Sequence, residues 1–149
     1  MSLLLLLVSV IGISSYFLFK DKINLLDVDH SAVDWNGKKQ KDTSGEENTI
    51  AIPGFEKVTL YANETTQAVN FHNTEINDCY FKISLIHPDG SVLWISDLIE
   101  PGKGMYSIEL EKTLAVGEYE NAVLKYECFS LNDQSPLNGS EINLKLVVV

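Results

Sequence analysis

The stretch "CYFKISLIHPDGSVLWIS", residues 79–96, decides the fold class because two alternating runs flank one short turn. In the first run every second residue is apolar, and such residues share one face of an extended chain. They are Cys79, Phe81, Ile83 and Leu85. "HPDG", residues 87–90, then supplies turn residues, and Gly90 can take the positive φ that many hairpin turns need. The stretch therefore predicts a β-hairpin with one buried face.

The same period of two recurs from Ile50 to the last residue, with turn residues between the runs. Turns are expected at Pro101–Gly104 and Asn138–Gly139, and Tyr106 is expected to point inward. The spacing predicts an all-β domain over residues 50–149, an antiparallel β-sandwich of about seven to eight strands. The expected strands are 49–53, 57–62, 67–73, 79–86, 91–96, 106–110, 118–131 and 141–149.

The charge balance weighs against nucleic acid as a partner. The 149 residues include 11 basic and 21 acidic side chains, and every basic residue is a lysine. A nucleic-acid binder needs a basic surface, and arginine is the preferred reader of phosphate and guanine. The acidity is expected to serve solubility.

The amino terminus, residues 1–22, is expected to be a membrane anchor or a signal peptide. Leu3–Phe19 carries no charge and is long enough to span a bilayer as a helix. Gly12–Ser14 is a poor cleavage site, which favours an uncleaved single-pass transmembrane helix. The lysines that follow the span, Lys20 and Lys22, would by themselves keep the domain in the cytoplasm, but Asp21 lies between them and long domains translocate largely regardless of charge.

Residues 23–49 are expected to form a polar tether between the anchor and the sandwich, since Asn36–Asn48 is too polar to pack. Trp35, inside this tether, is expected to contact the domain or the membrane surface.

Residues 27–38 of the tether match the sequence pattern of a calcium-binding loop only in part. Asp27, Asp29 and Ser31 stand at the first three ligand positions. Ala32 then replaces the glycine and Lys38 replaces the last glutamate, so no metal site is predicted.

The order Cys79, Trp94, Cys128, with a tyrosine two residues before the second cysteine, resembles that of immunoglobulin domains. The resemblance implies that Cys79 lies in the second strand, Trp94 in the third and Cys128 in the sixth, with the cysteines bridging the two sheets. Two cysteines on the inner face of an exported domain are expected to pair, whereas in a reducing cytosol they would remain buried free thiols.

Two tyrosines compete for the role of the corner tyrosine, whose hydroxyl ties down the turn into a late strand. Tyr126 precedes Cys128, whereas Tyr119 ends "LAVGEY", which resembles the corner of bacterial and fibronectin-like sandwiches. The glycine turn directly before Tyr119 favours that residue. Tyr119 and Trp94 are thus the expected structural corner residues.

No catalytic motif is found. His30, His72 and His87 are far apart in sequence, and no nucleophile elbow or phosphate-binding glycine loop is present. The chain is therefore predicted to be non-enzymatic and to need no cofactor. The alternatives are a carbohydrate-active or other hydrolytic enzyme that uses acidic residues on a sheet face, and a structural subunit of an envelope complex, signalled by an apolar patch near the final "VVV".

A wider resemblance covers most of the region from Ile50 to Leu146, including "IPGFEKVTLYANETTQAVNFHNTEINDCYFKISL" and "LIEPGKGMYSIELEKTLAVGEYENAVLKYECF". These segments resemble a group of small, uncharacterised, single-pass membrane-anchored proteins of Gram-positive bacteria. The resemblance implies a β-sandwich outside the cell membrane and no catalytic residues.

The expected function is that of an extracytoplasmic binding or assembly module in a bacterial cell envelope, held to the membrane by its N-terminal helix, with a protein or cell-wall partner. Sandwiches bind through end loops and exposed edge strands. The candidate binding residues in the predicted loops are His87, Asp89, Glu100, Lys103, Asn132, Asp133 and Asn138.

Overall fold

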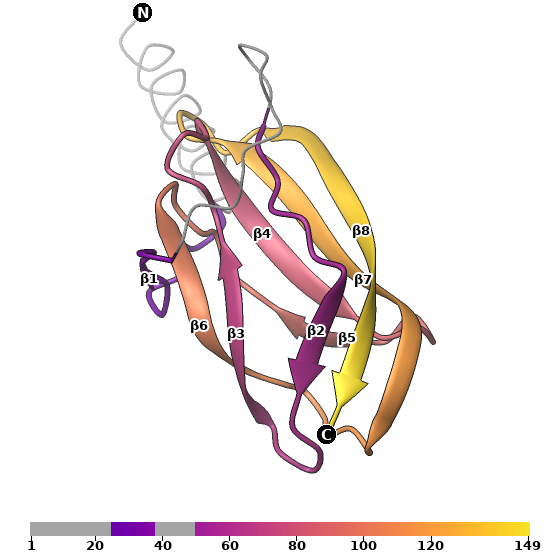
Figure 1. The fold of residues 1–149 in the computed structure, drawn as a ribbon. Coiled ribbons are helices and arrows are strands. Elements are labelled where there is room, and N and C mark those ends of the chain that lie inside the picture. The colour runs from indigo at the N-terminus through magenta and orange to yellow at the C-terminus, as the bar shows by residue number, and fades with distance from the viewer. Residues whose placement is uncertain (1–24, 38–49) are drawn as a thin grey trace, which may run out of the picture.

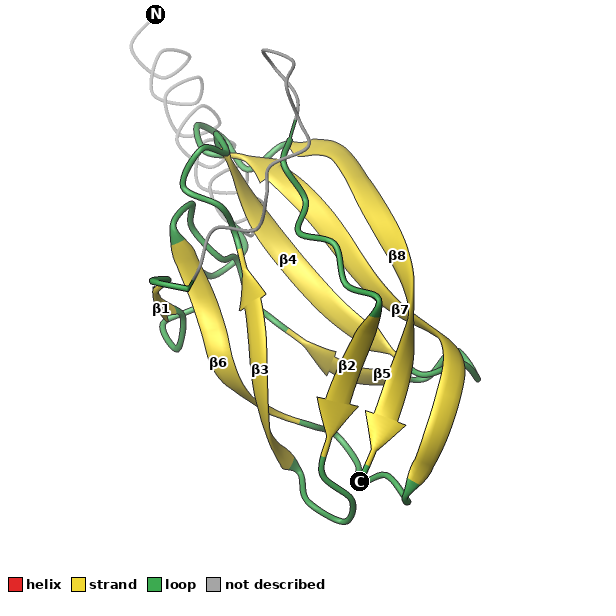
Figure 2. Cartoon of the chain, viewed as in Figure 1, coloured by secondary structure: helices red, strands yellow, loops and turns green. Residues whose placement is uncertain are grey.

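The computed structural model describes residues 25–37 and 50–149, and this part of the chain consists of strands and loops without a helix (Figures 1 and 2). The all-β prediction is therefore confirmed. The strands are β1 (Val33–Asp34), β2 (Lys57–Leu60), β3 (Thr66–His72), β4 (Cys79–Ile86), β5 (Val92–Ile95), β6 (Lys103–Glu109), β7 (Gly117–Ser130) and β8 (Pro136–Val148).

The strands form two sheets, one in the order β1-β6-β3 and one in the order β2-β8-β7-β4-β5. The sheets pack face to face with the core between them (Figure 1). One pair departs from the predicted antiparallel arrangement, since β2 runs parallel to β8. β2 is followed by β3 of the opposite sheet, so no tight hairpin turn requires β2 to run antiparallel to its neighbour.

The core is built from the faces that the alternation predicted. The four inner residues of β4 are at most 1% exposed, and Leu60 and Leu146 are fully buried. Aromatic rings connect the layers: Phe71 of β3 lies 5.8 Å from Trp94 of β5, centroid to centroid. Burial of these apolar side chains is the main stabilising term for the fold.

Three local predictions are wrong. Residues 49–53 do not form a strand in the part that is described, 50–53. Tyr106 is 38% exposed rather than inward, and its neighbour Met105 is buried instead. This change of facing in β6 lies where the β3–β6 pairing shifts register, between Ala68 and Phe71.

The third wrong prediction is the turn at Asn138–Gly139, since both residues lie within β8. The β7–β8 turn falls at residues 131–135 instead, where the N–H of Gln134 donates to the carbonyl of Ser130. Gly139 is needed for close approach: a Cβ there would lie 2.2 Å from the carbonyl oxygen of Tyr126.

Residues 25–37, which we call the strap, pack on the sandwich, so the predicted tether of residues 23–49 is wrong over this range. β1 pairs antiparallel with β6, and Val28 forms an isolated bridge with Leu98. The strap is held by backbone hydrogen bonds to β6, which do not depend on the polarity of its side chains. A prediction from polarity alone therefore does not detect this pairing. The rest of the predicted tether lies outside the described residues.

The predicted anchor, residues 1–22, also lies outside the described residues. Within 25–37 and 50–149 there is no helix long and apolar enough to cross a membrane.

Candidate binding surface

The strap distinguishes the two ends of the sandwich. Leu26 exchanges two hydrogen bonds with the side chain of Gln134 in the β7–β8 turn, at 2.7 and 3.0 Å. We call this the near end. At the opposite, far end lie the β2–β3 loop and the β6–β7 connection, and the β4–β5 turn protrudes from the side of the domain in this lower half (Figure 1).

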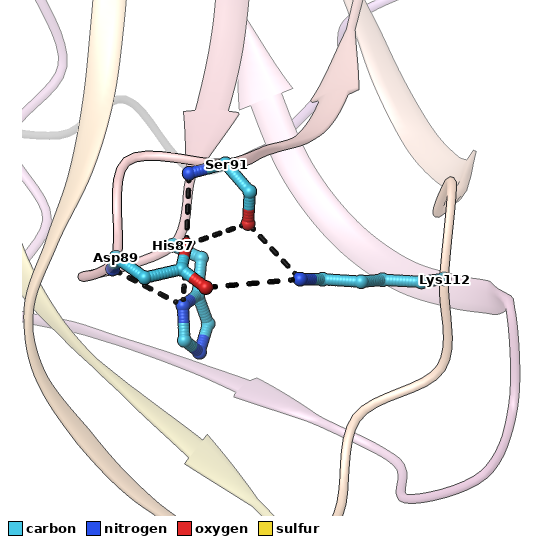
Figure 3. Close-up of polar contacts among 4 residues, drawn as sticks. All are labelled: His87, Asp89, Ser91 and Lys112. Carbon is cyan, nitrogen blue, oxygen red and sulfur yellow. Dashed lines mark hydrogen bonds and ion pairs between the residues drawn. The ribbon is translucent and has the colours of Figure 1, made fainter.

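The β4–β5 turn at the far end is ordered by its own side chains (Figure 3). Asp89 Oδ1 accepts from the Ser91 N–H at 2.8 Å and from the Ser91 hydroxyl at 2.6 Å. The Gly90 N–H closes the turn on the His87 carbonyl at 2.8 Å, with Gly90 at φ 88°. The turn predicted at "HPDG" is therefore present, and aspartate is favoured there because its side chain bonds to the backbone two residues later.

Lys112 of the β6–β7 connection and Tyr119 of β7 complete this surface. Lys112 Nζ donates to Ser91 Oγ at 3.0 Å and lies 4.0 Å from Asp89 Oδ2 (Figure 3). The ring of Tyr119, near the start of β7, packs edge-on against the His87 ring at 5.2 Å. We call His87, Asp89, Ser91 and Lys112 the far-end cluster.

The electrostatics of the cluster follow from these bonds. Hydrogen bonds from Ser91, and secondarily from His87, hold the pKa of the Asp89 carboxyl well below its usual range. The Asp89 N–H donates to His87 Nδ1 at 3.2 Å, and Asp89 Oδ1 lies 3.0 Å from the same nitrogen. The cluster is thus arranged to keep a carboxylate charged at the surface.

The geometry suits binding better than nucleophilic catalysis. The Ser91 hydroxyl donates to a carboxylate, so the imidazole of His87 does not take its proton. The side chains of Asp89 and Lys112 are 56% and 48% exposed, so each can bond to an external group. An acceptor and a donor thus stand side by side on an ordered turn.

The other predicted binding residues lie at the near end, so the structure does not bring them together with His87 and Asp89. Glu100 lies in the β5–β6 connection, and Asn132 and Asp133 lie in the β7–β8 turn. Asp133 repeats the local geometry of Asp89, since it accepts from the Ser135 N–H at 3.0 Å, and bonds from Ser135 lower its pKa.

Two of the predicted loop residues belong to strands instead. Asn138 lies in β8, and Lys103 is the first residue of β6. Lys103 Nζ lies 2.6 Å from Asp34 Oδ1 in the strap, which raises the pKa of the lysine and lowers that of the aspartate. The side chain of Lys103 therefore forms an ion pair with the strap.

Cys79 and Cys128 are both buried free thiols, and their strand assignment corrects the prediction. Cys79 lies in β4, the fourth strand along the chain, and not in the second. Trp94 lies in β5, the fifth strand, rather than in the third, and Cys128 lies in β7, the seventh, rather than in the sixth. β4 and β7 are neighbours in one sheet, so a bond between the cysteines would not bridge the sheets.

The two cysteines are diagonal neighbours on the inner face, since Cys128 pairs with Phe81 and Cys79 pairs with Ser130. The thiols hydrogen-bond to each other, which lowers the pKa of Cys79 and raises that of Cys128. Diagonal neighbours lie farther apart than directly opposed residues, and a disulfide requires Cβ atoms about 3.5–4.5 Å apart. The strand register alone does not bring the two Cβ atoms into that range, and the disulfide stays a prediction.

The two expected corner residues, Tyr119 and Trp94, lie in different surroundings. The Tyr119 hydroxyl donates to the Ala115 carbonyl at 2.8 Å, across the turn that Gly117 makes at φ 158°. Trp94 is 7% exposed in the core. Tyr126, the competing tyrosine, is buried with its hydroxyl lacking a hydrogen-bond partner among the described residues, and burial raises its pKa.

A shallow groove of about 470 Å³ lies on the outer side of the β7–β8 ladder. Glu127, Glu141 and Phe129 line it, together with Lys125, whose Nζ lies 3.6 Å from Glu127 Oε1. The carboxylates are thus accompanied by a cation. In the described part of the chain no group of three or more His, Cys, Asp or Glu side chains could hold a metal ion.

One feature of the site was not predicted from the sequence. Lys112 joins the far-end cluster from a segment more than 20 residues away in sequence, and no local motif marks it. Trp35 was expected to contact the domain or the membrane surface, and it contacts the domain by stacking on His72, although the sequence did not identify this partner.

Comparisons with protein-family models, with curated proteins and with solved structures found no match to this chain.

Proposed function

We propose that this chain is a non-enzymatic binding or assembly module, anchored to a bacterial cell membrane by residues 1–22 and displayed outside the cell. We further propose that its sandwich is immunoglobulin-like. Two sheets of three and five strands and the hydrogen bond of Tyr119 to Ala115 support that class.

The far-end cluster is the observation that carries the proposal. An exposed hairpin turn has few contacts of its own and is commonly mobile. Here Asp89, Ser91 and Lys112 fix the turn by side-chain bonds, so binding requires less ordering of the loop. With the chain entering at Leu26 at the near end, an anchored domain presents this turn away from the bilayer (Figure 1).

Site-specific photo-crosslinking in the cells that produce the protein tests the proposed surface. A photoreactive amino acid is placed at Asp89 in one variant and at Asp133 in another. Asp133 is the matched control, because it makes the same kind of turn at the near end. We expect adducts of defined mass from position 89 and few from position 133. Adducts from neither position, or equal yields from both, would contradict the far-end surface.

Thiol labelling of intact cells tests the membrane placement and the redox state together. Oxidation of Cys79 and Cys128 by an envelope disulfide carrier would transfer two electrons to that carrier and join the two sulfurs. With a membrane-impermeant maleimide, we expect intact cells to be labelled only after a reductant has been added, because the reductant opens the proposed disulfide. Free thiols that react only after lysis would place the domain in the cytoplasm.

A further inference from the structure

We propose that β3 is a docking edge to which an extended, lysine- or arginine-bearing peptide adds as a new strand. The inference goes beyond the far-end surface, because it concerns a second site and names the chemistry of its partner. Strand addition requires an edge with free main-chain groups and enough length for register.

The four sheet edges of the described domain differ in length. β1 has two residues, while β2 and β5 have four each. β5 is also partly closed, since the Leu93 carbonyl accepts from the Glu111 N–H at 2.8 Å. β3 has seven residues and ends the three-stranded sheet. It is the longest edge in the part of the molecule that the structure describes.

The register shows which groups of β3 face outward. The Leu110 N–H donates to the Thr65 carbonyl, so Gln67 and Ile108 form the next hydrogen-bonded pair. The N–H and C=O groups of Thr66 and Ala68 therefore point away from β6. No described strand lies on that side.

The side chains of this edge do not block it. Thr66, Ala68 and Asn70 are exposed, small and uncharged. Natural edge strands are commonly protected by lysine, by proline or by a bulge. β3 contains no lysine and no proline, and its bulge lies after Ala68.

The strap holds the upper part of the edge in place. The Trp35 indole N–H donates to Asn70 Oδ1 at 2.7 Å, and the indole ring stacks on His72. At the other end the buried amide of Gln67 bonds to the backbone of Tyr61, on both its N–H and its carbonyl. The edge is thus fixed at both ends before a partner arrives, which reduces the entropy lost on binding.

The charge around β3 selects a basic partner. From Val58 to Phe81 the chain carries Glu64, Glu75 and Asp78 but no lysine or arginine. On the paired strand β6, Glu109 adds a further carboxylate, bonded to the Thr66 hydroxyl at 2.7 Å, whereas Lys103 at the other end of β6 is paired with Asp34. Opposite charges at the ends of an added strand steer binding and set its register. A second copy of this acidic chain would be repelled.

The test measures binding of a fluorescent synthetic peptide, KVTVTVTK, to the full chain in detergent by fluorescence anisotropy. Three peptides are compared: the parent, EVTVTVTE, and a form of the parent N-methylated at alternate residues, which keeps the charges but loses donors on one edge. We expect the parent to bind and each of the other two to bind at least about tenfold more weakly.

The protein variants are Ala68→Pro and Ala68→Lys at the edge, with Ser107→Lys as the matched control. Ser107 is exposed on the facing position of β6, so its change adds the same charge away from the edge. The Ala68 N–H faces outward, so proline there removes no ladder bond. We expect about tenfold weaker binding for both edge variants and under about threefold for the control.

Equal binding of the N-methylated and parent peptides, or no binding of the parent up to about 1 mM, would overturn the proposal. A dimer that Ala68→Pro dissociates, seen by light scattering, would overturn the choice of partner. Asp89→Ala should leave peptide binding unchanged and Ala68→Pro should leave far-end crosslinking unchanged, so each of the two proposals can fail alone.

Discussion

The Trp35 indole lies flat on the His72 imidazole, with the ring centroids 3.8 Å apart and the planes 6° from parallel. The Trp35 side chain passes over β6 at Gly104 to reach His72. A Cβ atom on residue 104 would lie 3.0 Å from Trp35 Cδ1. A glycine on β6 is therefore what allows a strap residue to reach β3.

Replacing Trp35 by alanine should release the strap without unfolding the sandwich. The variant loses the stack and the bond to Asn70, and we expect a loss of about 1–3 kcal/mol in unfolding free energy. Hydrogen exchange at Val33–Trp35 should accelerate while exchange in β4 is unchanged. Val33→Ala, at an exposed position of the same strap, is the control. Unchanged exchange in the strap of Trp35→Ala would contradict this account.

The pH dependence of stability should report His72. Burial lowers the pKa of its ring, and its Nδ1 is buried without a hydrogen-bond partner. The folded chain therefore binds this proton less readily than the unfolded chain does. Its contribution is fully present above the unfolded pKa of about 6.5 and is lost as the pH falls through the lowered folded value. Lys103 and Asp34, the ion pair that fastens the strap, both remain charged in this range because the lysine pKa is raised and the aspartate pKa is lowered.

Urea unfolding from pH 7.5 down to pH 5 measures this effect. We expect the wild-type unfolding free energy to fall with pH more steeply than that of His72→Phe, which keeps an aromatic ring under Trp35 but cannot titrate. Identical slopes for the two proteins would exclude His72 as the origin.

The two tyrosines of β7 should respond oppositely to loss of the hydroxyl. Tyr119→Phe removes the bond to Ala115 and should cost about 0.5–1.5 kcal/mol. Tyr126→Phe removes a buried hydroxyl that has no described partner, so it should be neutral or stabilising. Differential scanning calorimetry of both variants provides the comparison. A larger loss for Tyr126→Phe would reassign the corner.

Asn77 should be a stability determinant although it is polar. Its buried amide bonds to the Ala51 N–H and carbonyl, at 2.8 and 2.9 Å, and to Asn73 Oδ1 at 2.8 Å. Asn77→Ala leaves these groups unsatisfied, and we expect a loss of about 1–3 kcal/mol or more in chemical denaturation. Asn132→Ala, in the exposed β7–β8 turn, should change stability by less than about 0.5 kcal/mol. Equal effects would show that the amide bonds contribute little.

The inner faces of the strands could be predicted because alternation along a chain is a local property. β4 and the far-end turn lie where the pattern of residues 79–96 put them. Tyr106 could not be placed from its own segment, since its direction depends on a bulge in the neighbouring strand.

The candidate site was only half predictable for the same reason. The turn residues His87 and Asp89 carry their own chemistry, whereas Lys112 reaches them from another segment across space. Asn138–Gly139 was mistaken for a turn because the sequence does not distinguish a glycine needed for close backbone approach from a glycine needed for a positive φ.

The position of β8 has a consequence for synthesis. β8 lies between β2 and β7, so the five-stranded sheet stays open until β8 has left the ribosome. Pairing of β2 with β8 closes a loop that spans most of the domain, which is slow compared with hairpin formation. The nascent chain thus lacks its final packing until β8 is available for pairing. Such an unfinished chain would suit the export that we propose, because it can still pass through a narrow translocation pore.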